Sequence, residues 1–395
     1  MRRHWVYGTR GPILTDIAAT TELSTDDLVK GVIDWISIES PTSDTDAVNR
    51  MVDHVTLEFE SAGLETERTS GEDGWGDLIR GRAPGSMRAN KGILVVSHTD
   101  TVHPIGTKET GNPIRIEGDN LYGPGTYDMK AGAYIAFYAY KRLIEEGGES
   151  KLPVTFMYIP EEERGSPYSR KYIAEEAQKA KYVLVTEPAR DGGKVVVERK
   201  GSARYKIAAE GRPAHSGAKH EYGRSAIKEI AKHICDIESW TDYDRGLTFN
   251  VGLIVGGTGI NVVPQHCVID VDNRFERLED GQEFETKILS LESYDPDVKL
   301  TVTGGINRPP MEATDATMDL FQRVRAYSQE HGLNLEYTSR TGGGSDGNLT
   351  AAEGVPTLDG LGADGYGAHQ LDEHIHISSL EPRARTWMKL LERLD

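Results

Sequence analysis

The sequence contains few cysteines, only Cys235 and Cys267 in 395 residues. Two cysteines cannot build a disulfide framework, and neither stands at a metal-ligand spacing, so we interpret both as small buried hydrophobic residues. Long apolar runs are missing as well, since none approaches the roughly 20 residues that a membrane-spanning helix needs. The N-terminal residues are positively charged, but no apolar segment follows them as in a secretory signal. Together these absences predict a cytoplasmic protein.

Positive charge is also scarce, with 45 Lys and Arg residues against 63 Asp and Glu residues and a formal net charge of −18. This excess of negative charge argues against nucleic acid and anionic membranes as partners. An anionic substrate would therefore need a locally basic pocket. The rest of the composition, 37% hydrophobic and 27% charged, is typical of a globular protein. A chain of this length exceeds one ordinary core, which predicts two domains.

Apolar runs and helical patterns alternate through the first half of the chain. A buried strand over 93–97 precedes a helical pattern over 129–146, and further strands are expected at 154–159 and 182–185. A tight turn at Gly123-Pro-Gly125 should place Asp128 at the N-cap of the helix or close to it. This order predicts an α/β fold with a mostly parallel sheet flanked by helices.

The pattern changes after Pro188. The order becomes βαββαβ, which is typical of a ferredoxin-like α+β sandwich. Its elements are expected at 202–210, 225–238, 248–255, 267–275, 282–291 and 298–303. We therefore predict an α/β domain in two parts, residues 1–190 and 306–395, interrupted by an inserted domain, residues 191–305. Residues 1–22 show no period and predict a loose arm of unknown role.

Histidines and carboxylates gather where the predicted strands end. They are His98, Asp100, Glu162, Glu163 and Glu187, together with Asp128 after the glycine turn and His369 in a late loop. Ligands of open α/β sheets bind at the carboxyl ends of strands. Imidazole and carboxylate ligands suit Zn²⁺, Mn²⁺ or Co²⁺, and the lack of a cysteine ligand fits a hydrolytic site rather than a structural one. The set is large enough for two metal ions that share one bridging ligand.

Each of these residues also has a simpler explanation when it is taken alone. His98 could be a structural histidine, Asp128 could only cap a helix, and the run Glu161–Glu163 could be a solvated loop. Glu187 followed by Pro188 could be an ordinary turn. What favours a metal site is that all of them are expected at the same edge of one sheet.

Several motifs resemble, in order, those of one enzyme family over about residues 90–375. They are His98-Thr-Asp100-Thr-Val, Gly123-Pro-Gly-Thr-Tyr-Asp128-Met-Lys, Glu161-Glu-Glu-Arg-Gly-Ser166, Thr186-Glu187-Pro188, Gly211-Arg-Pro-Ala-His215-Ser-Gly, Asn261-Val-Val-Pro264 and Gly342-Gly-Gly-Ser-Asp346. The sequence thus resembles the di-metal metallopeptidases that include aminoacylase, acetylornithine deacetylase, succinyl-diaminopimelate desuccinylase and glutamate carboxypeptidase. The glutamate carboxypeptidase branch is the most similar in pattern.

This resemblance implies a role for each residue of the expected metal site. Asp128 would bridge two divalent ions, most simply zinc, with cobalt or manganese in its place as a further option. His98 and Glu187 would complete one site, and Glu163 and His369 the other. Glu162 would be the general base for the hydroxide that the ions share, and Asp100 would orient His98. The family also implies a cis peptide bond between Asp128 and Met129. Relatives often have Asp where this chain has Glu161, which we expect to lie behind the ligands at most.

For the inserted domain, the resemblance implies lid and dimerisation functions. His215 would stabilise the oxyanion in the active site of the other subunit of a homodimer, although alone it could be a surface histidine. Asn261 and Arg274 match the family's substrate-binding pair, and Arg274 suits a carboxylate. Lys194 and Arg308 lie near anion-binding positions but could equally be solvated charges. Backbone contacts to the substrate are expected from Gly344 and Ser345.

The leading hypothesis is therefore a metal-dependent hydrolase of the carboxypeptidase or aminoacylase type. It would cleave an amide bond in an N-acyl amino acid or small peptide with a free carboxylate, and could release glutamate or aspartate. A competing hypothesis is a hydrolase of another C–N bond, such as a deacylase of a biosynthetic intermediate or an aminohydrolase of an amino-aromatic acid, because fold and metal do not fix the substrate. The same residues are also compatible with a single-metal enzyme and with a non-catalytic metal-dependent binding protein.

Overall fold

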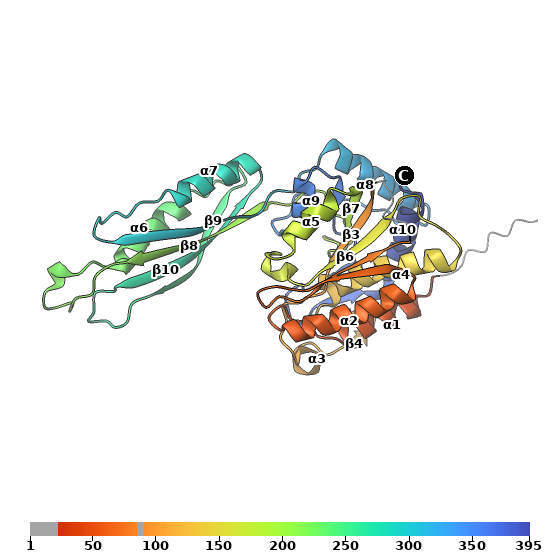
Figure 1. Cartoon of the computed structure of the whole chain (residues 1–395), viewed down its shortest axis with the longest axis horizontal. Coiled ribbons are helices and arrows are strands. Elements are labelled where there is room, and N and C mark those ends of the chain that lie inside the picture. Colours follow the sequence, from red (N-terminus) through yellow and green to blue (C-terminus); the bar gives the residue numbers. More distant parts are fainter. Residues whose placement is uncertain (1–22, 85–90) are drawn as a thin grey trace, which may run out of the picture.

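The computed structural model describes residues 23–84 and 91–395, so the predicted arm over 1–22 lies outside the described residues. An α/β domain and an elongated inserted domain lie end to end (Figure 1). The α/β domain contains a six-stranded sheet in the order β1-β2-β6-β3-β7-β12. Its strands are β1 Glu65–Thr69, β2 Leu78–Arg82, β3 Gly92–His98, β6 Val154–Ile159, β7 Ala180–Val185 and β12 Thr357–Leu358.

The core of this sheet is parallel, as the sequence predicts. Strand β3 pairs in parallel with both β6 and β7, and β12 pairs in parallel with β7, whereas β1 and β2 are antiparallel. The register sets His98 beside Ile159, the last residue of β6. The loops after β3, β6 and β7 therefore leave the sheet at one edge, which is where the predicted ligands lie.

Helices cover both faces of the sheet because successive strand residues point in opposite directions. Ile93 and Val95 of β3 pack into a core with α1 Thr25–Ile36, α2 Thr45–Ser61, α4 Ala131–Glu145, α8 Asp315–Gln329 and α10 Leu380–Arg393. Leu94 and Val96 face the other core, formed with α5 Arg170–Ala177 and α9 Asp346–Ala352. Both faces of β3 are thus buried, which explains its unbroken apolar run.

Two predicted helix starts need correction. Helix α4 begins at Ala131 with Lys130 at the N-cap, so Asp128 precedes the cap and lies in a segment with non-helical backbone angles. The helix expected over 282–291 is α7 Leu278–Leu289. It begins earlier because Asp280 in its first turn accepts hydrogen bonds from Arg277 and Arg245, which stabilise that turn.

A second small sheet, which the sequence does not predict, lies beside the glycine turn. Its order is β13-β14-β5-β4, with β4 Arg115–Glu117, β5 Asn120–Tyr122, β13 Gly365–Tyr366 and β14 His374–His376. His374 of β14 pairs with Tyr122 of β5 across about 250 residues of sequence. This pairing brings the loop that carries His369 next to the turn that carries Asp128. The short helix α3 Thr107–Thr110 lies in the loop before β4.

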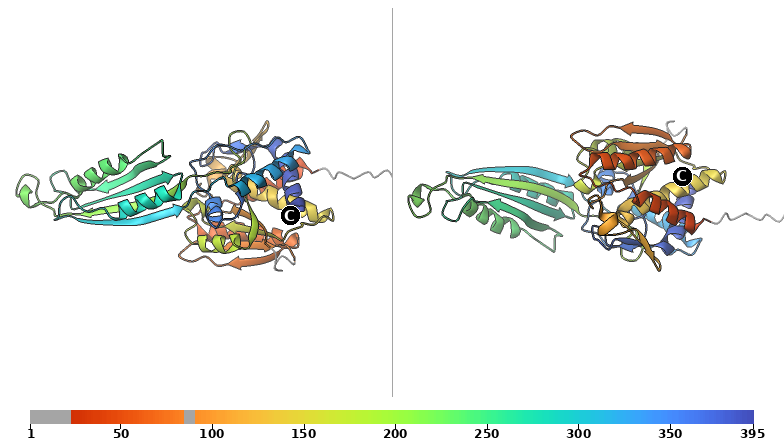
Figure 2. Two further views of the ribbon diagram at one scale, coloured as in Figure 1. Left: turned by 90° about the horizontal axis from the view of Figure 1, so that it is seen from above. Right: turned by 90° about the horizontal axis from the view of Figure 1, so that it is seen from below.

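The inserted domain has the ferredoxin-like order β11-β8-β10-β9 in an antiparallel four-stranded sheet. Its strands are β8 Gly201–Glu210, β9 Thr248–Gly256, β10 His266–Phe275 and β11 Lys299–Arg308. Alternate residues of β8 pack with α6 Ala226–Glu238 and α7 on one face. The views of Figure 2 show that this domain projects away from the α/β domain. No helix in the described ranges is long and apolar enough to cross a membrane.

A buried ion pair joins α5 to strand β2 of the main sheet. The two terminal guanidinium nitrogens of Arg82 donate to Glu176, at 2.9 and 2.8 Å, and Glu176 is only 6% exposed. Burial opposes ionisation of Glu176, but the hydrogen bonds from Arg82 and Lys179 lower its pKa to about 2. The pair therefore stabilises the fold above the ordinary pKa of a glutamate, and this stabilisation is lost as the pH falls toward 2.

We expect Glu176→Gln to lower the free energy of unfolding by about 3 kcal/mol at pH 7, because it removes the buried charged partner of Arg82 and leaves only the exposed Glu67. The loss should shrink between about pH 4.5 and pH 2, since the wild-type carboxylate is itself protonated there. Chemical denaturation of the metal-free chain at pH 7 and near pH 2 measures this difference in the free energy of unfolding. Glu67→Gln is the matched control, because Glu67 also pairs with Arg82 but is more than half exposed. A loss at Glu67 equal to that at Glu176 would contradict the argument.

Candidate metal centre

Two groups of side chains could each hold a metal ion, and they share one residue. His98, Asp128 and Glu187 form the first group, and Asp128, Glu163 and His369 form the second. Within each group the potential ligand atoms lie within 4.8 Å of one another. All five ligands expected from the sequence are thus brought together, with Asp128 in the central position.

The two oxygens of Asp128 point to different histidines. Oδ1 lies 3.2 Å from Nε2 of His98, and Oδ2 lies 3.5 Å from Nε2 of His369. His98 is also 3.8 Å from Glu187, and His369 is 3.1 Å from Glu163. The peptide bond that follows Asp128 is cis, as the resemblance implied. A carboxylate that serves two imidazoles in this way can bridge two cations.

Asp100 contacts both His98 and the loop after β6. Its carboxylate lies 3.4 Å from Nδ1 of His98, and its main-chain oxygen lies 2.9 Å from the same atom. The same carboxylate accepts the backbone N–H groups of Glu162 and Glu163, at 3.1 and 3.2 Å. Asp100 therefore fixes the imidazole and the two glutamates together. The hydroxyl of Thr42 donates to Asp100 at 2.7 Å, a contact that sequence patterns did not indicate.

Glu162 and Glu163 are neighbours in one 3₁₀ turn, but their side chains have different partners. Glu163 faces His369, whereas Glu162 accepts a 2.8 Å hydrogen bond from Arg308. Burial raises the pKa of Glu162 well above its ordinary value, against the opposite effect of Arg308. Glu162 thus lies beside the two groups without belonging to either of them.

The charges of the cluster fit divalent cations. Burial raises the pKa of Glu187 to about 8 and also raises the pKa of Glu163, and the Asp128 carboxylate adds to both shifts. Hydrogen bonds to Asp128 and Glu163 raise the pKa of His369 to about 11. One oxygen of Glu163 is buried and has no hydrogen-bond partner among the described residues. Positive charge at the centre of the cluster would relieve the crowded carboxylates and occupy this oxygen.

Glu161 takes no part in either ligand group. It is fully buried and accepts hydrogen bonds from the backbone of Tyr168 and from both the backbone and the hydroxyl of Ser169. Burial raises its pKa to about 7. Glu161 therefore holds the turn behind the loop, in line with its expected position behind the ligands.

His215 and Asn261 lie together on the inserted domain, at a distance from the ligand groups. Their segments meet through a backbone hydrogen bond from Ser216 to Asn261, and both residues are exposed. His215 Nδ1 accepts the backbone N–H groups of Gly217 and Ala218, at 3.1 and 3.2 Å. The proton of a neutral His215 is therefore on Nε2, which remains free to donate.

Arg274 lies where the inserted domain meets the α/β domain. It pairs with Asp272 at 2.7 Å and donates to the main-chain oxygen of Gly342 at 3.3 Å. Lys194 lies in a surface turn, with its ammonium 4.0 Å from Glu336 and its side chain more than one-third exposed. These contacts place Arg274, but not Lys194, where the two domains meet.

Arg308 is not a solvated surface charge. It is 4% exposed and donates to Glu162, to Asp346 at 2.7 Å and to the main-chain oxygen of Ser345 at 2.8 Å. The backbone of Gly344 packs so closely on Arg308 that a Cβ there would be 2.8 Å from its Cδ. The hydroxyl of Ser345 donates a hydrogen bond to Asp359, and Asp359 also pairs with the buried Arg199 at 2.7 Å. Hydrogen bonds from Arg199 and Arg308 thus hold the loop of residues 342–345 in place. Sequence patterns did not indicate Arg199 or Asp359.

Comparisons with known proteins agree with this geometry. Residues 94–393 match the model of peptidase family M20/M25/M40. The chain is 32% identical over 366 residues to carboxypeptidase G2 of Pseudomonas sp. strain RS-16, which covers 90% of this chain and 86% of that one. It is 26% identical over 344 residues to the succinyl-diaminopimelate desuccinylase of Albidiferax ferrireducens, with coverage of 81% and 85%.

The fold is similar to that of an M20 family metallo-carboxypeptidase from Sulfolobus solfataricus, with a TM-score of 0.73 and 17% identity. That similarity covers 93% of this chain and 99% of the other. The family match covers most of the chain and confirms the family that the motifs predicted. The chain therefore belongs to peptidase family M20/M25/M40 and is a metal-dependent enzyme that hydrolyses amide bonds.

Proposed function

We propose that this enzyme cleaves the amide bond of an N-acyl amino acid or small peptide with a free carboxylate. The observation that carries the proposal is the pair of ligand groups that share Asp128, with Glu162 beside them but in neither group. The relatives support the substrate class, since one is a carboxypeptidase and another is a desuccinylase of succinyl-diaminopimelate. The hypothesis of a non-catalytic binding protein is set aside, because the family is one of hydrolases.

In this proposal, His98, Asp128 and Glu187 would hold one divalent ion, and Asp128, Glu163 and His369 would hold the other. Zinc suits these ligands best, and cobalt and manganese are the next candidates. When bound, the ions polarise the scissile carbonyl and lower the pKa of water. A single-ion enzyme is the competing arrangement.

Glu162 then acts as the base that takes a proton from the attacking water and later gives it to the leaving amine. Its Oε1 accepts a 2.8 Å hydrogen bond from Arg308, and its other oxygen remains available for the proton. The guanidinium groups of Arg308 and Arg274 would bind the carboxylate of the substrate. Arg308 contacts Gly344 and Ser345, whose backbone we propose to line the substrate site, and Arg274 donates to Gly342 of the same loop.

His215 donates to the developing oxyanion through Nε2, and we propose that it does so in the active site of a partner subunit. Strand β8 has 10 residues and carries the chain about 30 Å from the domain joint before His215. At the edge of the same sheet, β9 exposes Leu253, Ile254 and Val255. An exposed apolar edge strand is a pairing site for another chain, which supports a homodimer through the inserted domain. Both cysteines are free, which agrees with a cytoplasmic location, but only Cys267 is buried as expected, whereas Cys235 is exposed on helix α6.

A panel of substrates and metals tests the proposed function. We expect hydrolysis of N-acyl amino acids and dipeptides by chelator-treated protein reloaded with zinc, cobalt or manganese. Converting the free carboxylate of the best substrate to a carboxamide should lower kcat/KM about 30-fold or more, because a charged pair with arginine is lost. Equal turnover of both compounds, or preference for aminobenzoates or succinylated diamines without that dependence, would favour a hydrolase of another C–N bond. Full turnover by the metal-free protein would contradict the proposal.

A further inference from the structure

One buried carboxylate outside the ligand groups holds the turn that carries Asp128. Glu373 is 1% exposed, and its side chain accepts three backbone N–H groups from this turn. Oε2 accepts from Gly125 at 2.8 Å, and Oε1 accepts from Tyr127 and Asp128, both at 2.9 Å. Three charge-assisted hydrogen bonds from one turn fix the path of its backbone.

Glu373 is in turn held from several sides. Nε2 of the buried His103 lies 3.3 Å from its carboxylate. Its main-chain oxygen accepts from the Asn112 side chain at 2.9 Å and from the Gly123 backbone at 3.3 Å. These partners lie about 250 residues away in sequence, so the contacts join the last part of the α/β domain to the first. The loop after β3 and the glycine turn therefore both rest on Glu373.

We propose that Glu373 is a positioning residue of the metal centre, which acts through the backbone of Asp128 and through no contact with substrate. It holds the turn so that the Asp128 carboxylate stands between the two imidazoles. Because Glu373 follows His369 by four residues in the same loop, it also keeps a second ligand at a fixed place relative to the first. The inference rests on the proposed function, in which Asp128 bridges two metal ions.

The chemistry of this site requires a carboxylate. Both oxygens of Glu373 accept N–H groups, and a glutamine would direct its own NH₂ group at one of these donors. An aspartate keeps the charge, but it is one methylene shorter and cannot reach all three N–H groups from the same backbone. The two substitutions therefore separate the effect of charge from the effect of geometry.

The experiment titrates metal-free protein with Co²⁺ and records the dissociation constant and the visible spectrum of the bound ion. For Glu373→Gln we expect Co²⁺ binding about 10- to 100-fold weaker than in the wild type and a changed spectrum. Losses of this size are usual when a residue that orients a metal ligand is replaced. Glu373→Asp should also bind Co²⁺ more weakly, since the charge alone does not place Asp128. Thermal unfolding of each metal-free variant checks that the fold is kept.

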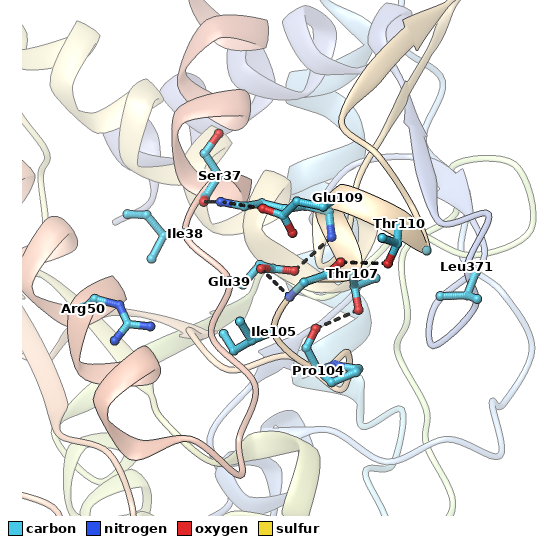
Figure 3. Close-up of a pocket in the computed structure, with 13 residues that line it drawn as sticks. Ser37, Ile38, Glu39, Arg50, Pro104, Ile105, Thr107, Glu109, Thr110 and Leu371 are labelled. Carbon is cyan, nitrogen blue, oxygen red and sulfur yellow. Dashed lines mark hydrogen bonds and ion pairs between the residues drawn. The ribbon is translucent and has the colours of Figure 1, made fainter.

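Glu39→Gln is the matched control. Glu39 also accepts backbone N–H groups, from Gly106 at 2.9 Å and Lys108 at 3.0 Å, but these belong to the segment around α3 (Figure 3). This segment borders a cavity of about 1060 Å³ and carries no metal ligand. The control should therefore keep the Co²⁺ affinity and spectrum of the wild type.

Wild-type Co²⁺ affinity and spectrum in Glu373→Gln would overturn the inference. Full affinity in Glu373→Asp combined with loss in Glu373→Gln would do the same, because charge would then be the cause. If Glu373→Gln does not fold, His103→Gln decides: a several-fold weaker affinity in folded protein supports the inference, and an unchanged affinity overturns it. Failure of the proposed function is distinguishable, because the wild type itself would then bind no Co²⁺ or hydrolyse no amide.

Discussion

Replacing Glu162 with glutamine should lower kcat by roughly 10²- to 10⁴-fold while the protein keeps its metal ions. The amide has the size of the carboxylate and can still accept the hydrogen bond from Arg308, so the surroundings change little. It cannot take up a proton from water, however, which is the role proposed for this side chain. The measurement is kcat and KM on the best substrate together with metal content by elemental analysis.

Glu163→Gln is the matched control, because the two residues are neighbours in the same turn. Glu163 lies 3.1 Å from His369 within one ligand group, so its substitution should reduce metal content as well as activity. The two variants should thus both be inactive but differ in the metal they hold. Near-normal turnover by Glu162→Gln, or a loss of metal equal to that of Glu163→Gln, would show that Glu162 is not the base.

The main sheet could be predicted because its central strands are buried on both faces. Strand β3 carries the uninterrupted run Ile93–Val96, and β6 has the bounds expected from its apolar residues. The βαββαβ order of the inserted domain followed from alternation and glycine breaks in the same way. In these elements, local pattern and tertiary burial favour the same structure.

The small sheet could not be predicted, because its strands contain only two or three residues each. Segments of this length show no measurable period, and their pairing joins residues about 250 positions apart. Asp128 does lie close to the helix N-cap, but its non-helical backbone conformation could not be predicted, for a related reason. Its conformation depends on contacts with Glu373, which lies in that distant segment.

The metal ligands could be predicted because strand ends and motifs both indicated them. Side chains that support the expected ligands from behind carry no such signal, as Thr42 and Glu373 show. Arg308 is a further case, because an arginine in a sequence gives no sign of burial. Only the structure reveals that Asp346 and Glu162 surround it. Pairs of this kind depend on the folded arrangement of distant loops.

A mixed dimer should reveal whether His215 serves the active site of its partner. Each homodimer, Glu162→Gln or His215→Ala, should be nearly inactive, since loss of one oxyanion donor costs about 10²- to 10³-fold in kcat. A heterodimer of the two variants should recover about half of the wild-type activity per dimer, because a two-fold symmetric pair has two equivalent sites. One of these sites would combine an intact Glu162 with an intact His215 from the other chain. Two affinity tags isolate the heterodimer before its activity is measured.

The decisive comparison is a heterodimer between a wild-type chain and a chain with both substitutions. If His215 acts in the partner's site, each site of this dimer lacks one group, and activity should stay near that of the single variants. If His215 acted within its own chain, the results would be reversed: this dimer would keep one complete site, and the first heterodimer would have none. The exposed position of His215 and the length of β8 favour the first outcome. Because both heterodimers contain the same two substitutions, a difference between them cannot come from folding and reports only which chain completes the site.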